Sequence, residues 1–294
     1  MGWGRAGRTA AFLVLLSLTA CADRDGAGPG AAGVPQDDDA LVLRVELTGG
    51  FVPPETIPAR LPLVSVHGDG RVLLEGPVEA IHPGPAWPNV QVVDVGRDGV
   101  RALADRALAA GVAETGDLGM PPLADAPSTR FTLVTSGGTH VREVYALTEA
   151  AGLPRGGLTE AQEAAREELR ALLGELTDLG LAEPGKRGPR PWTPDAVAAV
   201  VRPWTASEDD VAHGLVPAPV PWPGPALPGE ALGASPGLSC VVAEGEQAEA
   251  VIGAARNATA LTPWSAPDGT RWSALFRPLL PDESGCADLP GQGG

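Results

Sequence analysis

Alternating apolar and polar positions predict β-strands in the first half of the chain. The clearest segment is Leu41–Leu47, where apolar side chains at every second position would line one face of a strand. The same period recurs in three further segments: 61–75, a hairpin reversing at Gly68-Asp69-Gly70; 91–95; and 131–147, a hairpin around Gly137-Gly138 that would set Val134 opposite Val141. These segments predict antiparallel hairpins.

Two segments instead show the period of an amphipathic α-helix. In the first, Asp98 is a candidate N-cap, an apolar stripe runs over 100–108, and Gly111 ends the helix. In the second, Thr159 is the candidate N-cap, and Gln162 completes a capping box. The buried stripe of this second helix comprises Ala165, Leu169, Leu172, Leu173, Leu176 and Leu179. Hairpins and helices together predict an α+β domain over residues 41–180.

A proline-rich stretch at 181–194 ends this periodicity and is interpreted as a linker. Beyond it, residues 195–286 are expected to form a smaller C-terminal α/β domain. It would contain a strand at Ala196–Arg202 and then a β-α-β unit made of Ser239–Val242, a helix at Glu246–Arg256 and a strand at Arg271–Phe276. Residues 287–294 are expected to be a loose tail.

The N-terminus carries the most specific motif of the chain. Arg5 and Arg8 precede an apolar run of about eleven residues, which is shorter than the ~20 residues that a membrane-spanning helix needs. Small residues then lead directly to a cysteine in Leu18-Thr19-Ala20-Cys21. This order is typical of a secretory signal peptide, here residues 1–20.

Leu18-Thr19-Ala20-Cys21 resembles the lipobox of bacterial lipoproteins. In that family the cysteine thiol receives a diacylglycerol and becomes the first residue of the mature chain. The resemblance therefore implies a lipidated Cys21 that anchors the protein to the outer face of the plasma membrane. An ordinary signal peptide with a coincidental cysteine is the alternative. Residues 21–40 contain no aromatic side chain and are expected to be a flexible tether.

Three segments of the body strengthen this resemblance. They are Gly49-Gly50-Phe51-Val52-Pro53, His67-Gly68-Asp69-Gly70-Arg71-Val72 and Arg277-Pro278-Leu279-Leu280-Pro281. In these segments the chain is similar to uncharacterised secreted lipoproteins of high-GC Gram-positive bacteria. The similarity implies a location and carries no activity with it.

Composition restricts the partners and the redox state. Hydrophobic residues make up 44% of the chain, which favours a folded body, and the formal charge of −16 argues against nucleic acid as a partner. If Cys21 is lipidated, Cys240 and Cys286 remain as a pair in an oxidising compartment, where we expect a structural disulfide. Free thiols or a redox couple are the alternatives, although no C-x-x-C spacing supports redox chemistry.

Motifs for catalysis or metal binding are weak. Residues 233–237 match the nucleophile elbow G-x-S-x-G, but Pro236 has no N–H for an oxyanion hole and no histidine follows His213. This segment is interpreted as a turn. His67 and His140 lie close to hairpin reversals and are expected to be exposed side chains rather than ligands of a shared metal. We therefore predict no catalytic residue, metal or cofactor.

Four tryptophans each follow a proline, namely Trp192, Trp204, Trp222 and Trp264. They are the candidate binding residues, because an indole offers a flat apolar face with a polar edge. Filling of the core is the simpler interpretation. The function that fits these observations is a non-enzymatic cell-surface lipoprotein that binds an unidentified ligand or partner or supports the envelope. An envelope hydrolase with carboxylates distant in sequence is the alternative.

Overall fold

The computed structural model describes residues 1–3, 33–153, 157–181, 188–233 and 237–291. Residues from Ala32 to Gly294 form one compact unit that contains, among its described parts, five α-helices and two sheets whose strands are antiparallel except for one parallel pair. The chain is therefore an α+β protein. The first sheet contains β1 (Leu41–Gly49), β2 (Val64–His67), β3 (Arg71–Glu75), β4 (Val90–Asp94), β5 (Pro127–Thr135), β6 (Gly138–Tyr145) and β7 (Arg190–Pro191).

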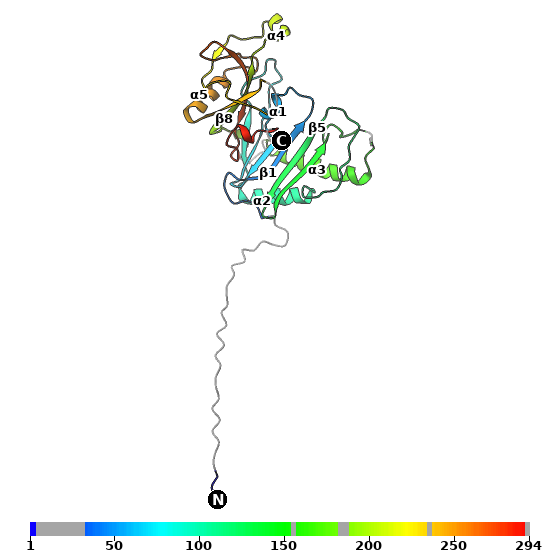
Figure 1. The fold of residues 1–294 in the computed structure, drawn as a ribbon. Helices are drawn as coiled ribbons and strands as arrows, with labels where there is room; N and C mark the ends of the chain where they lie inside the picture. The colour runs from blue at the N-terminus through cyan, green and yellow to red at the C-terminus, as the bar shows by residue number, and fades with distance from the viewer. Residues whose placement is uncertain (4–32, 154–156, 182–187, 234–236, 292–294) are drawn as a thin grey trace. The chain divides into compact units, whose positions relative to one another are not determined.

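The first sheet has the strand order β6-β5-β1-β2-β3-β4-β7, so that β1 lies between the two expected hairpins (Figure 1). All neighbouring strands in it are antiparallel. The expected pairing of Val134 with Val141 is wrong, because Val134 pairs with Thr139 instead. Thr135 and Gly138 close a turn at Ser136 and Gly137, one residue earlier than the glycine pair suggests.

Two long helices pack against this sheet, α2 (Gly96–Ala109) and α3 (Glu160–Asp178). The capping box predicted for α3 is confirmed, since Gln162 N–H donates to Thr159 Oγ1 at 3.2 Å and Thr159 N–H donates to Gln162 Oε1 at 2.9 Å. Asp98 does not cap α2, which begins at Gly96. Gly96 has a φ of 66°, a conformation that costs glycine little, and its N–H donates to Asp94.

The core of this layer joins both helices to the strands. Its fully buried side chains include Val42, Val45, Phe131, Leu133, Val100, Ala104, Leu169, Leu172 and Leu176. A second apolar cluster contains Leu73, Val92 and Leu280, with Trp192 packed against it. Leu280 follows the last strand of the chain, so the C-terminal segment packs on the first sheet.

The second sheet has the order β10-β11-β8-β13-β12-β9. Its strands are β8 (Ala196–Pro203), β9 (Val220–Pro221), β10 (Glu230–Ala231), β11 (Ser239–Glu244), β12 (Trp264–Ser265) and β13 (Arg271–Pro278). The β-α-β unit forms as expected from β11, α5 (Gly245–Arg256) and β13, but β8 lies between its strands and is antiparallel to both. α5 buries Ala248, Val251, Ile252 and Ala255 against this sheet.

Three short helices were not predicted, because none is long enough to show a helical period in the sequence. They are α1 (Thr56–Ala59), α4 (Glu208–Ala212) and the 3₁₀ helix η1 (Cys286–Asp288). Among the described residues, no helix combines the length and hydropathy that crossing a bilayer requires.

The segments expected to be a tether, a linker and a tail contact the folded body where the structure describes them. Within the expected tether, Asp38 pairs with Arg97 of α2 and Asp39 with Arg71 of β3, which fixes the chain before β1 against the starts of these two elements. Within the expected linker, β7 pairs with β4. The C-terminal tail was expected to be loose, but its described part packs on the body: Leu289 is 3% exposed and lies in an apolar cluster with Cys240.

Candidate functional site

A groove lined by two tryptophans lies where the loop between β3 and β4 meets β7 and the end of α5. We call it the tryptophan groove; its volume is about 750 Å³ and its lining includes Trp87, Trp192 and five prolines. Sites for small ligands in proteins have volumes of roughly 300–1,000 Å³ and mostly apolar walls. The groove thus has the size and chemistry of a binding site.

Backbone contacts hold both sides of the groove in place. Trp192 N–H donates to Val90 O at 3.0 Å, which aligns the residue after β7 with β4. On the other side, Ala86 N–H donates to Ala258 O at 3.1 Å and Ala260 N–H donates to Gly84 O at 2.9 Å, so that the loop is fixed to the chain after α5. The groove is therefore built before any ligand arrives.

Each tryptophan of the groove has one side packed on a different apolar cluster. Trp87 lies 6.3 Å from Phe276 between ring centroids, at the core of the second sheet, and Trp192 packs on the cluster around Leu73 and Val92 in the first. Neither ring has much freedom to reorient. Both indoles therefore present their accessible faces to the groove at little entropic cost on binding.

Exposed apolar and charged side chains complete the lining. Val78 and Ile81 are 64% and 58% exposed, although such side chains are stabilised by burial. Arg256 and Glu79 also line the groove, and neither forms an ion pair with any residue that the structure describes. The groove can therefore bind an apolar or extended ligand that carries a charge of either sign.

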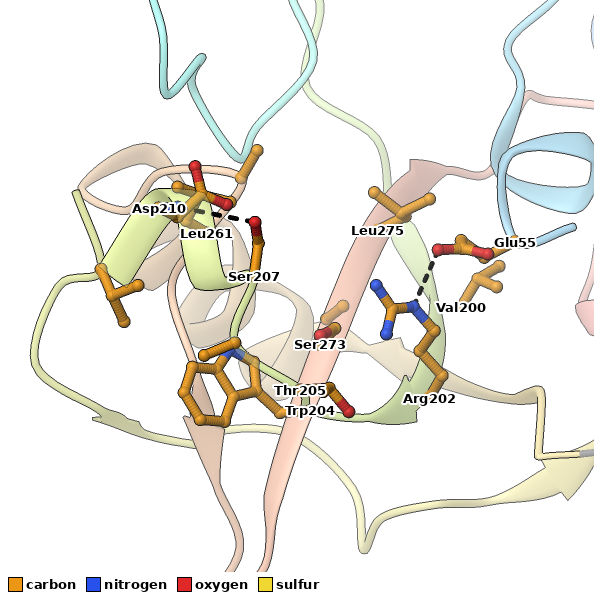
Figure 2. Close-up of a pocket in the computed structure, with 14 residues that line it drawn as sticks. Glu55, Val200, Arg202, Trp204, Thr205, Ser207, Asp210, Leu261, Ser273 and Leu275 are labelled. Atoms are coloured by element: carbon orange, nitrogen blue, oxygen red, sulfur yellow. Dashed lines mark hydrogen bonds and ion pairs between the residues drawn. The ribbon is translucent and has the colours of Figure 1, made fainter. Parts of the chain in front are cut away.

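A second, smaller pocket lies at the end of β8 and β13 (Figure 2). We call it the Arg202 pocket; its volume is about 160 Å³. Arg202 and Ser273 are cross-strand partners, so both side chains lie on the same face of the second sheet. Arg202 Nε donates to Glu55 Oε1 at 2.8 Å, and Asp210 lines the pocket from α4.

The four tryptophans selected from the sequence do not form one platform. Trp264 is 1% exposed, and its ring meets Trp222 edge-on with 5.7 Å between centroids, so these two belong to the core of the second sheet. Trp204 lines the Arg202 pocket and Trp192 the tryptophan groove. Sequence reasoning missed Trp87, which precedes a proline in Ala86-Trp87-Pro88 instead of following one.

Three side chains between β2 and the C-terminal segment follow the order of a catalytic triad. Ser65 Oγ lies 3.1 Å from His67 Nε2, and His67 Nδ1 lies 4.0 Å from Asp282 Oδ1 and 3.2 Å from the carbonyl oxygen of Asp39. Ser65 and His67 are both 0% exposed, so no substrate can reach the hydroxyl. This cluster is therefore part of the core.

The positions of the histidines differ from what the sequence predicted. His67 is buried rather than exposed, because Asp282 and the residues before β1 cover it, and its burial lowers the pKa of its imidazole. His140 lies on β6, and the strands β5 and β1 separate it from the strand of His67. The described residues contain no group of three or more His, Cys, Asp or Glu side chains suited to a metal ion.

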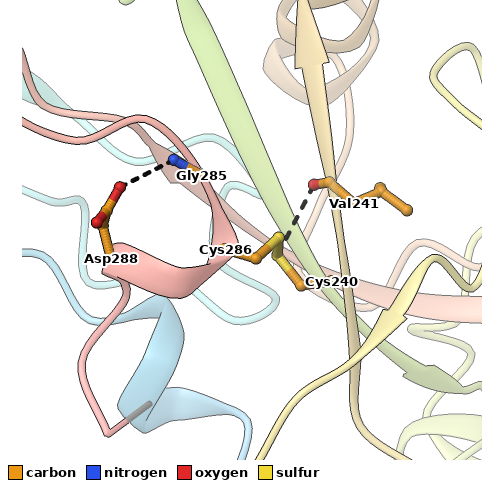
Figure 3. The surroundings of a disulfide bond; sticks show 5 residues. All are labelled: Cys240, Val241, Gly285, Cys286 and Asp288. Atoms are coloured by element: carbon orange, nitrogen blue, oxygen red, sulfur yellow. Dashed lines mark hydrogen bonds between the residues drawn. A yellow bond between two sulfur atoms is a disulfide. The ribbon is translucent and has the colours of Figure 1, made fainter. Parts of the chain in front are cut away.

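The predicted disulfide is confirmed. Cys240 on β11 is bonded to Cys286 at the start of η1, and their Cα atoms are 6.1 Å apart (Figure 3). Asp288 accepts hydrogen bonds from the N–H groups of Ser284 and Gly285, which fixes the turn that presents Cys286. The bond attaches the C-terminal segment to the second sheet. Cys21 and Ser235 lie outside the described residues.

Comparison with known proteins finds no matching family model, no matching curated protein and no matching solved structure.

Proposed function

We propose that this protein is a lipoprotein anchored through Cys21 to the outer face of the plasma membrane, with a folded body that binds a partner without catalysing a reaction. The observation that carries the binding role is the tryptophan groove, with two fixed indoles and exposed Val78 and Ile81 at its edge. The lipobox supports the anchor, since two acyl chains on one cysteine hold a protein stably at a membrane.

An extended proline-rich peptide is the partner that suits this groove best. Aromatic-lined grooves bind such peptides because a polyproline helix is already ordered and presents flat apolar rings. Trp87 and Trp192 supply the aromatic faces. Arg256 and Glu79 can pair with charged residues of the peptide, since the described part of the chain gives neither an ion-pair partner.

The contacts in the Arg202 pocket argue against the hydrolase alternative. Glu55 and Asp210 line this pocket from positions far apart in the sequence, as that alternative requires. A pair of carboxyl groups hydrolyses a glycosidic bond only if both are available to the substrate. Glu55 is paired with Arg202 at 2.8 Å, so of the two carboxyl groups only that of Asp210, which contacts His82 through one oxygen at 3.1 Å, has an oxygen left for a substrate.

The binding role is tested with a short polyproline peptide and the purified full chain, with tryptophan fluorescence as the readout. Ile81→Asp places a charge at the edge of the groove, and Val211→Asp is the matched control because Val211 is similarly exposed (56%) outside the groove. Ile81→Asp should weaken binding by at least about tenfold, the value of one buried aliphatic side chain. Equal affinities for both variants, or turnover of an ester or cell-wall substrate, would contradict the proposal.

A further inference from the structure

The strand β11 leaves part of its backbone without a neighbour. On one side β8 pairs with β11 along its whole length, whereas on the other side β10 pairs only with Ser239 and Cys240. Backbone groups along a strand point alternately toward its two neighbours. Leu238 O accepts from Leu232 N–H on the side of β10, so the N–H and C=O of Val242, four residues further on, point to that side too. Neither group of Val242 bonds to a residue that the structure describes.

A groove lies beside this open edge. We call it the β11 groove; its volume is about 480 Å³. Val241 and Val242 line it together with Pro225, which precedes β10, and Cys286 at the start of η1. The disulfide from Cys240 holds η1 beside the strand (Figure 3). The edge of β11 is therefore open to another chain and not covered by the fold.

The open part of β11 carries none of the features that usually block such an edge. Proteins protect edge strands with lysine, proline or a β-bulge, because unpaired backbone groups are a template for a further strand. Here the sequence is Val241-Val242-Ala243, and the pairing with β8 continues through it without a shift of register. The strand is therefore regular and apolar where it is unpaired, and it can accept an added strand.

The charges around the edge are negative. Glu230 lies opposite Cys240, so the side chains of Glu230, Val242 and Glu244 lie on the same face of the sheet. Both glutamates and Glu246, in the first turn of α5, are exposed. None of the three forms an ion pair with a residue that the structure describes. Opposite charges on neighbouring strands stabilise their pairing, so this edge favours a basic partner.

We propose that the β11 groove binds an extended protein segment in which basic and apolar side chains alternate, and that this segment adds a strand to the second sheet. Val242 N–H donates to the added strand and Val242 C=O accepts from it, while the basic side chains lie beside Glu230 and Glu244. Pairing by strand addition takes its affinity from the main chain and its specificity from alternate side chains. The surface is separate from the tryptophan groove, because the residues that line the two are different.

The same charges disfavour a second copy of this chain as the occupant. If two β11 strands paired with each other, Glu230 and Glu244 of both copies would gather at one seam. Like charges on neighbouring strands destabilise their pairing. The open edge is therefore suited to a different chain of opposite charge.

The proposal is tested by fluorescence anisotropy with the purified full chain and two labelled six-residue peptides. One peptide alternates lysine with valine, and the other alternates glutamate with valine. The lysine peptide should bind at least about tenfold more tightly, because its charges attract the glutamates that the other peptide repels. Equal affinity for both peptides, or no binding of the lysine peptide, overturns the proposal.

A proline at the open edge tests the role of the backbone. Val242→Pro removes an N–H that the pairing with β8 does not use, and a proline is tolerated at such an edge position. The affinity for the lysine peptide should fall at least about threefold. Val141→Pro is the matched control on β6, the edge strand of the first sheet. Ala146 N–H donates to Pro127 O, so the N–H of Val141, five positions earlier, points away from β5. This control should bind the peptide as the wild type does.

A reversal of charge tests the site independently of the backbone. Glu244→Lys should weaken binding of the lysine peptide at least about threefold. Glu208→Lys changes the net charge equally at an exposed position outside the groove, and it should have less than about a twofold effect. If circular dichroism shows that Val242→Pro does not fold, Glu244→Lys decides. Wild-type affinity in a folded variant of either residue overturns the proposal. So does a dimer of the wild type, seen by sedimentation, that Glu244→Lys or Val242→Pro abolishes, because a second copy would then occupy the edge.

Discussion

Glu283 accepts a hydrogen bond from Arg277 Nη2 at 2.8 Å, and the two side chains are only 3% and 1% exposed. Burial raises the pKa of Glu283 and lowers the pKa of Arg277, because the charged form of each is separated from water. The pair forms where the segment after β13 packs beside Arg44 of β1, which contacts Asp282 at 2.8 Å. It therefore helps to attach the C-terminal segment to the first sheet.

Removal of one partner of this buried pair should destabilise the protein strongly. Glu283→Ala would leave the Arg277 guanidinium buried and without its counterion, which costs about 3–5 kcal/mol of unfolding free energy. The matched control is Glu167→Ala, which breaks the ion pair with Arg170 where Glu167 is 69% exposed. The control should cost at most about 1 kcal/mol. Urea unfolding measures the loss of unfolding free energy in both variants. Similar losses would show that the buried pair contributes no more to stability than the exposed one.

Loss of the disulfide should destabilise the protein by a comparable amount. Cys240 and Cys286 are 46 positions apart, and closing a loop of that length contributes about 4 kcal/mol in the chain-entropy model. The double variant Cys240→Ala/Cys286→Ala should therefore unfold at a lower urea concentration than the oxidised protein. Reductant should lower the midpoint of the wild type and leave that of the double variant unchanged. A shift in both would indicate an effect of the reductant itself.

Regular elements were predictable wherever the sequence repeats a local pattern. The capping box at Thr159 and Gln162 and the alternation in Leu41–Leu47 depend on neighbours in sequence, and both predictions hold. The register of Val134 was not predictable to the residue, because two adjacent glycines permit turns one position apart. The short helix α1 shows no period at all, although Glu55 before it lines the Arg202 pocket.

The candidate sites were less predictable than the fold because they depend on contacts between distant segments. Trp192 was selected from the sequence, but its partner Trp87 lies more than a hundred positions earlier and shares no local motif with it. The burial of His67 follows from Asp282, which the chain reaches only near its end. In contrast, the disulfide was predictable because a lipidated Cys21, which the lipobox resemblance implies, would leave only two cysteines to pair.

The proposed lipid anchor at Cys21 gives a prediction about membrane association that does not depend on the folded body. Cys21→Ala removes the thiol that would accept the diacylglycerol, so the protein should leave the membrane fraction and its signal peptide should be processed differently. Cell fractionation and mass spectrometry of the N-terminal peptide measure both effects. Cys240→Ala/Cys286→Ala is the control, because it also removes cysteines yet should stay at the membrane. Retention in that fraction of a Cys21→Ala protein whose signal peptide has been removed normally would refute the lipid anchor.

The buried His67 should make stability depend on pH in a defined direction. The pKa of His67 in the folded protein lies below the ordinary value of 6.5, chiefly because burial disfavours the charged ring, although Asp282 opposes this shift. Arg44 and Arg71 act in the same direction as burial. As the pH falls below 6.5, the unfolded chain binds a proton that the folded protein does not. Stability should then decrease by up to about 1.4 kcal/mol for each pH unit.

Comparison with a variant isolates this contribution from those of the carboxyl groups. His67→Asn lacks the titrating ring, so between pH 6.5 and the lower pKa of the folded state its stability should fall less steeply than that of the wild type. Above that window the two slopes should agree, because the imidazole is neutral in both folded and unfolded chains. Urea unfolding at a series of pH values measures both slopes. Identical slopes throughout would mean that His67 keeps an ordinary pKa in the folded protein.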